Sequence, residues 1–378
     1  MRFLRRRRRP PDLELTVAVR QPDSDAELPG SVEPTSAPQL TAAGLTEMLR
    51  EAGALPEGAV TSLEIARRLD TTISSLYFAS VTYSEPAPPL PDRILVKWPL
   101  EGSAAPDAGL PEITFYNELA PSLSSPPMVR CVATAPAPTG RQWIVLEDLR
   151  STHTNPPWPE PPSGPEAEGA VSVLAQVHAQ WWEAPALGRN VGTLHTDASL
   201  RAMVQGIAAN LPGFIDALGD TLSPHDRRSL ETVFGSSLAP WLRLVDPRAL
   251  TVTHGDAHTW NFLFPRSGTG LPYLIDWQLW HLDVGARDLA FLMALHWHRT
   301  FRQGVERPLL QLYHRQLEAA GVAGYSFEDL WLDYRRCAVR NLTFPIILWR
   351  RGLEPEAWRH RLDCALDAYR DLDGEELL

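Results

Sequence analysis

The chain has 378 residues and a formal net charge of −11. Its length allows two modest domains, and a content of 44% hydrophobic and 21% charged residues excludes a wholly disordered or fibrous chain. The acidic composition also argues against a general nucleic-acid-binding protein, which needs a basic face. Residues 1–38 begin with a block of arginines and continue with proline, serine and acidic residues, a composition that predicts a disordered tail.

Residues 39–150 are expected to form a small β-rich first domain. Runs of β-branched and aromatic residues bounded by proline and glycine predict strands, and apolar residues at helical spacing predict helices. We expect strands over residues 60–68, 77–83, 94–98, 129–134 and 142–146, and helices over residues 41–54 and 112–119. The expected architecture of this part is an antiparallel sheet with one helix inserted.

Residues 151–378 are expected to form a larger helical domain, which begins with a proline-rich linker after His153. Short strands are expected over residues 250–253 and 273–275, on either side of a loop. Helices are expected over residues 167–182, 200–209, 223–234 and 241–245, and from residue 288 to the end. The fold class is therefore α+β, with a small β-rich lobe followed by a helical lobe.

The number of cysteines and the hydropathy of the sequence indicate in which cellular compartment the protein is expected. The three cysteines are few and widely spaced, so they predict neither a disulfide framework nor a zinc site. A membrane span needs about 18 consecutive apolar residues, and the sequence has no such stretch. The simplest expectation is a cytoplasmic protein without stable membrane association.

The sequence contains a single lysine among its 35 basic residues, Lys97 in the apolar stretch ILVKWP. A chain that uses arginine almost everywhere retains one compact ammonium group inside an expected strand. Arginine is larger and cannot replace such a group at a tight site. Lys97 is therefore a candidate functional residue.

The chemically richest stretch surrounds the motif His254-Gly255-Asp256. Asn261 follows five residues after Asp256, and Asp276 ends the next expected strand. One carboxylate can accept a proton from a hydroxyl, while an amide oxygen and a second carboxylate can hold Mg²⁺, which prefers hard oxygen ligands. Phosphoryl transfer needs this combination of positioning and charge neutralisation.

These motifs resemble the aminoglycoside phosphotransferase and choline-kinase-like superfamily, and their details resemble its CHK-kinase-like (ecdysteroid-kinase-like) branch. The matching pieces occur in the family's order over roughly residues 60–290: ILVKWP, EITFYNELAP, IVLEDL, LAQVHAQWW, HGDAHTWN, LIDWQ and GARDLA. The resemblance implies a protein-kinase-like fold with two lobes, residues 39–150 binding ATP and residues 151–378 carrying catalysis and the acceptor. It implies a kinase that uses ATP and Mg²⁺ to phosphorylate a hydroxyl of a small molecule.

The resemblance also implies individual roles. Asp256 matches the catalytic base, and Asn261 and Asp276 match the magnesium ligands. Lys97 matches the strand lysine that contacts the nucleotide phosphates, and Glu112 matches the helix carboxylate that pairs with this lysine. Glu118 remains a rival partner for Lys97. Glu147 belongs to residues 145–149, which match the hinge beside adenine.

The expected phosphate-binding loop, residues 69–75, departs from the family because it contains no glycine. The hydroxyl groups of Thr72, Ser74 and Ser75 can still contact phosphate. Asp70 brings a negative charge into this loop, so we expect ATP to bind more weakly than is usual for the family.

Two other functions stay open. His254, Asp256 and His258 have the spacing of metal ligands and would suit a metallohydrolase. A catalytically weak pseudokinase is the second alternative. For a kinase, the acceptor is an aminoglycoside-like, choline-like or sterol-like alcohol. The acidic composition favours a cationic acceptor, and the 13 tryptophans suit either a cation or an apolar ring.

Overall fold

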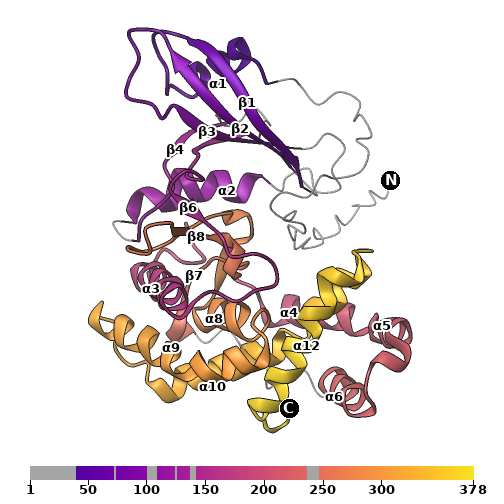
Figure 1. Cartoon of the computed structure of the whole chain (residues 1–378). Coiled ribbons are helices and arrows are strands. Elements are labelled where there is room, and N and C mark those ends of the chain that lie inside the picture. Colours follow the sequence, from indigo (N-terminus) through magenta and orange to yellow (C-terminus); the bar gives the residue numbers. More distant parts are fainter. Residues whose placement is uncertain (1–39, 72–73, 100–108, 124–125, 137–141, 236–246) are drawn as a thin grey trace, which may run out of the picture.

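The computed structural model describes residues 40–71, 74–99, 109–123, 126–136, 142–235 and 247–378. The predicted tail (residues 1–38) and the predicted helix over residues 241–245 lie outside these residues. Figure 1 shows the β-sheet above the helical region, with α2 (Leu110–Thr114) between them. No helix among the residues so described is long and apolar enough to cross a membrane.

The N-terminal region contains one antiparallel sheet with the strand order β1-β2-β3-β5-β4. Its strands are β1 (Val60–Asp70), β2 (Ser74–Tyr83), β3 (Arg93–Pro99), β4 (Cys131–Thr134) and β5 (Ile144–Glu147). All five predicted strands are present. The first two extend further toward each other than predicted, so the turn between them is shorter.

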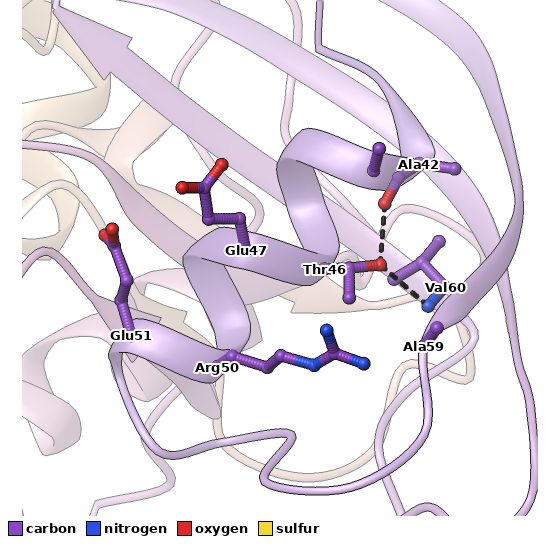
Figure 2. A pocket seen from close by; sticks show the side chains of 8 residues that line it. Ala42, Thr46, Glu47, Arg50, Glu51, Ala59 and Val60 are labelled. Carbon is purple, nitrogen blue, oxygen red and sulfur yellow. Dashed lines mark hydrogen bonds between the residues drawn. The ribbon is translucent and has the colours of Figure 1, made fainter.

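The two faces of this sheet have different partners, because side chains alternate along a strand. On the outer face, Tyr77 and Val96 pack against α1 (Ala42–Glu51). Thr46 joins α1 to the sheet by donating to the carbonyl of Ala42 at 2.8 Å and accepting from the amide of Val60 at 2.9 Å (Figure 2).

The inner face of the sheet meets the core of the helical region, where Ile144 and Leu146 pack. The predicted helix over residues 112–119 is α2 continued by a π-helical turn, Phe115–Leu119. Phe115 and Leu119 are buried in the same core, so this element connects the sheet with the helices below it.

The C-terminal region is mainly helical, as predicted. Its helices are α3 (Gly164–Trp181), α4 (Asp197–Ala208), α5 (Leu211–Leu218), α6 (Pro224–Gly235), α8 (Ala286–Met293), α9 (Arg299–Ala319), α10 (Phe327–Arg340), α11 (Thr343–Arg350) and α12 (Pro355–Asp371). Local sequence sets several boundaries. For example, Ser163 precedes α3 and its amide donates to Glu166 at 2.8 Å, which is part of a capping box.

Short strands in this region carry the loops of the site. β7 (Leu250–Thr253) pairs with β10 (His281–Val284), and β8 (Phe262–Pro265) lies between β6 (His153–Thr154) and β9 (Tyr273–Leu274). β6 belongs to the beginning of the predicted proline-rich linker. This stretch is therefore packed on the helical region at β8, and the division of the chain at residue 150 stays a prediction.

Candidate active site

The loop between β7 and β8 begins with His254-Gly255-Asp256. Gly255 has a φ of 80°, a conformation that glycine adopts without steric cost. A Cβ atom there would collide with the carbonyl oxygen of Leu279 and the ring of His281. The loop continues with a backbone hydrogen bond of 2.8 Å from His258 to Asp256. A tight turn thus brings the Asp256 carboxylate to the end of β7.

Asp288, near the beginning of α8, holds this turn in place through hydrogen bonds to its backbone. Its carboxylate accepts hydrogen bonds from the backbone amides of His254 at 2.6 Å and Gly255 at 2.9 Å. It also lies 3.2 Å from Nε2 of His178, whose Nδ1 lies 2.8 Å from the hydroxyl of Tyr313. Asp288 is fully buried. The sequence GARDLA therefore supplies a brace for the loop, and not a group that faces a ligand.

Asp256 and Asn261 lie in direct contact. The Asn261 amide group donates to the backbone carbonyl of Asp256 at 2.8 Å and to its Oδ2 atom at 3.3 Å. The other carboxylate atom of Asp256, Oδ1, is buried and has no hydrogen-bond partner. Burial, together with the negative charge of Asp276, raises the pKa of Asp256 well above its ordinary value, while Arg361 opposes this shift.

Lys97, Glu112 and Asp276 form a second contact group. Nζ of Lys97 lies 2.6 Å from Oε2 of Glu112 and 2.9 Å from Oδ1 of Asp276. Burial alone lowers the pKa of Lys97, but the two carboxylates outweigh it and raise this pKa. Glu118 is exposed. Glu112 is therefore the helix carboxylate that pairs with Lys97.

The two contact groups lie side by side. The backbone amide of Ile275, next to Asp276, donates to the carbonyl of Asn261 at 2.9 Å. His254 also contacts this segment, because its Nε2 lies 2.9 Å from the carbonyl of Ile275. The structure thus brings together Lys97, Glu112, Asp256, Asn261 and Asp276, which come from four separate segments of the sequence.

Asp276 itself has an unusual backbone. Its φ of 68° and ψ of 62° lie in the left-handed region, which costs energy for a residue other than glycine and is found at functional sites. The next residue, Trp277, stacks on Phe115 with a centroid separation of 3.7 Å. Trp280 then donates to the carbonyl of Pro111 at 2.7 Å. These contacts join the Asp276 loop to α2, so Glu112 and Asp276 are positioned together.

The β1–β2 turn corrects part of the expected phosphate-binding loop. Leu76 lies opposite Lys97 and Ser75 lies opposite Trp98, so Ser75 points to the face away from Lys97. There its hydroxyl donates to Asp70 at 2.6 Å. Ser74 is on the Lys97 face. The predicted contact of Ser75 with phosphate is therefore not supported, and Asp70, which is paired with Ser75, lies on the same face, away from Lys97. Residues 72–73, which include Thr72, lie outside the described residues.

The expected hinge follows β5. Glu147 pairs with Ile94, whereas Ile144 pairs with Lys97, so the side chain of Glu147 lies on the outer face of the sheet. A role beside adenine would therefore use its backbone. After it, Asp148 forms an ion pair with Arg150 at 2.8 Å. The guanidinium of Arg150 lies 3.8 Å from the ring centroid of Phe78.

Sequence reasoning named His258 only as a possible metal ligand and missed the aromatic residues and the arginine that lie around it. Trp158, from the predicted linker, lies 4.3 Å from Trp260 between ring centroids. Arg361 on α12 donates from Nε to His296 at 3.0 Å. Burial and the charge of Arg361 lower the pKa of His258 to about 3. These residues come from four distant segments, so no local motif could have identified them.

The metallohydrolase alternative has no structural support. Among the residues with described positions, no group of three or more His, Cys, Asp or Glu side chains could hold a metal ion. His254 is directed to the carbonyl of Ile275. The spacing of His254, Asp256 and His258 therefore reflects the turn and its hydrogen bonds.

Comparisons with known proteins agree with this geometry. The sequence profile of the phosphotransferase enzyme family (APH) matches residues 88–330. No curated protein sequence matches the chain. The solved structure of the GDP complex of wild-type aminoglycoside 2'-phosphotransferase-IIIa has a TM-score of 0.51 at 13% identity, and the match covers 89% of this chain and 100% of that chain.

Two other solved structures match the chain with similar TM-scores and sequence identities. Spectinomycin phosphotransferase in complex with ADP and spectinomycin has a TM-score of 0.50 at 13% identity, with 88% of this chain and 95% of that chain covered. The macrolide 2'-phosphotransferase from Brachybacterium faecium has a TM-score of 0.47 at 17% identity, with coverages of 81% and 91%. The expected kinase-like α+β fold is confirmed. Because the family profile spans well over half of the chain, the protein belongs to the phosphotransferase enzyme family, as a small-molecule kinase.

Proposed function

We propose that the protein transfers the γ-phosphate of ATP, in the presence of Mg²⁺, to a hydroxyl group of a small molecule. The observation that carries this proposal is the arrangement of Lys97, Asp276 and Asp256. A buried ammonium contacts one carboxylate, and a second carboxylate beside it keeps an oxygen atom without a partner. Phosphoryl transfer needs a phosphate-binding cation, a metal-binding carboxylate and a group that orients the acceptor.

The residues present fit a magnesium ion. Asn261 commits its amide nitrogen to Asp256, so its amide oxygen is the atom that would face a metal. Asp276 offers a carboxylate held ionised, because the ammonium of Lys97 outweighs burial and lowers its pKa. Hard oxygen donors of this kind suit Mg²⁺, which neutralises charge on the phosphates when it is bound.

Asp256 acts on the acceptor. Oδ2 is held by Asn261, so the unpartnered Oδ1 is the atom that would receive a hydrogen bond from the acceptor hydroxyl. Asp256 takes up the hydroxyl proton as the acceptor oxygen bonds to the γ-phosphorus and the bond to the β-phosphate oxygen breaks. A buried base with a raised pKa is suited to accept that proton.

The remaining expected residues act on the nucleotide. Lys97 contacts phosphate, and Glu112 orients its ammonium group, which is held at 2.6 Å. Ser74 lies on the same face as Lys97 and is the hydroxyl that can approach phosphate. Glu147, whose side chain lies on the outer face of the sheet, would contribute to the hinge beside adenine through its backbone.

Two variants test the assignment. Asp256→Asn keeps the shape but removes the proton-accepting charge, and the loss of a positioned base costs about 10²–10⁴ in rate. Nucleotide binding, measured by calorimetry with ATP and Mg²⁺, should be nearly unchanged. Asp276→Asn should instead weaken metal-dependent ATP binding as well as turnover.

The outcome separates a kinase from a pseudokinase. Near wild-type ADP formation by Asp256→Asn on a verified acceptor would contradict the assignment of the base. Absence of ATP binding by the wild type at millimolar nucleotide would favour a pseudokinase. The CHK-kinase-like branch, the cytoplasmic location and the identity of the acceptor stay predictions.

A further inference from the structure

We propose that the acceptor site lies against a cluster formed by Trp158, His258, Trp260, His296 and Arg361, and that it takes a neutral alcohol with an apolar or aromatic body. We call these five residues the tryptophan–histidine cluster. The inference rests on the proposed function, because it assumes that Asp256 receives the acceptor hydroxyl. It adds the chemical class of the acceptor.

Three unsatisfied polar atoms mark the place where a ligand binds. They are Oδ1 of Asp256, Nδ1 of His258 and Nε1 of Trp260, which belong to alternate residues of one loop. The three residues are 3%, 7% and 3% exposed. Buried polar atoms in folded proteins almost always have partners, so three neighbouring exceptions indicate a site that a polar ligand completes. An alcohol offers both a donor for Asp256 and an oxygen for an adjacent N–H group.

The walls of this site are aromatic. Trp158 is half-buried, and its ring lies 4.3 Å from Trp260. His258 lies 5.4 Å from Trp260 and 5.5 Å from His296, again between ring centroids. Rings in this arrangement bind planar or apolar bodies by burial and by offset or edge contacts. An acceptor whose hydroxyl reaches Asp256 therefore has an indole surface beside it.

The permanent charge in the cluster is positive. Arg361 is only 4% exposed, and its guanidinium lies 4.4 Å from the ring centroid of Trp158. At the His258 end of the cluster, Nε2 of His258 lies 3.6 Å from Oδ2 of Asp256, the carboxylate that receives the acceptor hydroxyl in the proposed function. An acceptor with several ammonium groups would bring them close to a buried guanidinium, while Asp256 is assigned to the acceptor hydroxyl and Asp276 is paired with Lys97. The site therefore selects against polycations.

Trp158 is held in position before any acceptor binds. The side-chain amide of Asn155 donates to the backbone carbonyls of Trp260 and Phe262, both at 2.9 Å. Prolines occupy positions 156, 157 and 159 and restrict the backbone on either side of Trp158. A fixed indole at the edge of the site determines which acceptor body fits, so Trp158 is the specificity-determining residue.

The experiment compares probe alcohols with the full-length protein in the absence of nucleotide. Saturation-transfer NMR and titration would measure binding of 2-naphthalenemethanol, trans-1,2-cyclohexanediol, choline and kanamycin. The variants are Trp158→Ala and the conservative Trp158→Phe. Trp331→Ala is the matched control, because Trp331 is also half-buried and has the guanidinium of Arg307 5.2 Å from its ring centroid.

We expect 2-naphthalenemethanol to bind, and Trp158→Ala to weaken its binding about tenfold, as loss of an aromatic contact predicts. Trp158→Phe should retain most of the affinity, and Trp331→Ala should leave it unchanged. Tighter binding of kanamycin or choline than of the neutral alcohols, an equal effect of Trp158→Ala and Trp331→Ala, or no binding of any neutral alcohol would overturn the inference.

An ADP-release assay with the same probes separates this inference from the proposed function. If kanamycin is phosphorylated and Trp158→Ala has no effect, the inference fails while the kinase function stands. If the neutral alcohol binds through Trp158 but no probe supports ADP formation and ATP does not bind, the site stands and the proposed kinase function fails.

Discussion

The brace formed by Asp288 gives the most quantitative prediction. Both carboxylate oxygens accept hydrogen bonds from backbone amides of the loop that carries Asp256, from His254 at 2.6 Å and from Gly255 at 2.9 Å. Asp288→Asn has nearly the same volume but replaces one oxygen by an NH₂ group. In either orientation, one backbone amide then faces a donor instead of an acceptor. The substitution therefore tests the brace without changing the packing.

The cost follows from the hydrogen bonds that change. A buried donor without a partner costs about 1–3 kcal/mol, and a hydrogen bond to a charged group is worth about 1.5–3 kcal/mol. The contact with His178 also loses its charge. We expect the free energy of unfolding to fall by about 2–4 kcal/mol, allowing for relaxation of the loop. Because the loop carries Asp256, turnover should fall more than ATP affinity.

Urea unfolding followed by fluorescence measures the difference, and Asp92→Asn is the control because Asp92 is exposed. Burial raises the pKa of Asp288, but the hydrogen bond and charge of His178 outweigh it and lower this pKa. The stabilisation is therefore complete above the unfolded-state pKa of about 4 and is lost as the pH falls through the folded-state pKa. Equal stability of Asp288→Asn and Asp92→Asn at pH 7 would refute the reasoning.

Two further predictions concern the turns of the site. Gly255→Ala should lower the free energy of unfolding and turnover, because the φ of Gly255 is 80° and a Cβ atom would meet the carbonyl of Leu279. The control Gly206→Ala, in helix α4 with open space around it, should be neutral or stabilising. A higher melting temperature for Gly255→Ala than for Gly206→Ala would contradict the turn geometry. Asp70→Asn should leave the ATP dissociation constant unchanged in calorimetry, because Asp70 lies on the face of the sheet away from Lys97, whereas Lys97→Met should raise this constant. Tighter ATP binding by Asp70→Asn would show that Asp70 faces the phosphates.

Much of the site could be predicted because it is encoded in short motifs. Asp256 and Asn261 lie five residues apart in one loop, and their contact is set by local backbone geometry. Lys97 was conspicuous as the only lysine, and its ion pair with Glu112 is the contact that the resemblance implies, whereas the phosphate-binding role of Lys97 and the magnesium-binding role of Asp276 stay predictions. The sequence left two possible partners for Lys97, because Glu112 and Glu118 lie in the same short segment. The packing of that segment buries Glu112 and leaves Glu118 exposed.

The β1–β2 turn could not be predicted to the residue. Asp, Thr and Ser are common in turns, so the sequence did not show that β1 extends to Asp70 and β2 begins at Ser74. The consequence is large, because adjacent residues of a strand point to opposite faces. Ser74 and Ser75 were equivalent candidates in the sequence, whereas the register separates them and pairs Ser75 with Asp70.

The charge of the acceptor shows why composition is a poor guide to a site. A net charge of −11 describes mainly the solvated surface, where salt screens individual charges, and it suggested a cationic acceptor. At the acceptor site that we propose, however, the acceptor meets the tryptophan–histidine cluster, whose permanent charge belongs to the buried Arg361. A buried charge is screened far less than a surface charge, so one guanidinium outweighs many distant carboxylates. Its position depends on how α12 packs, which only the tertiary structure reveals.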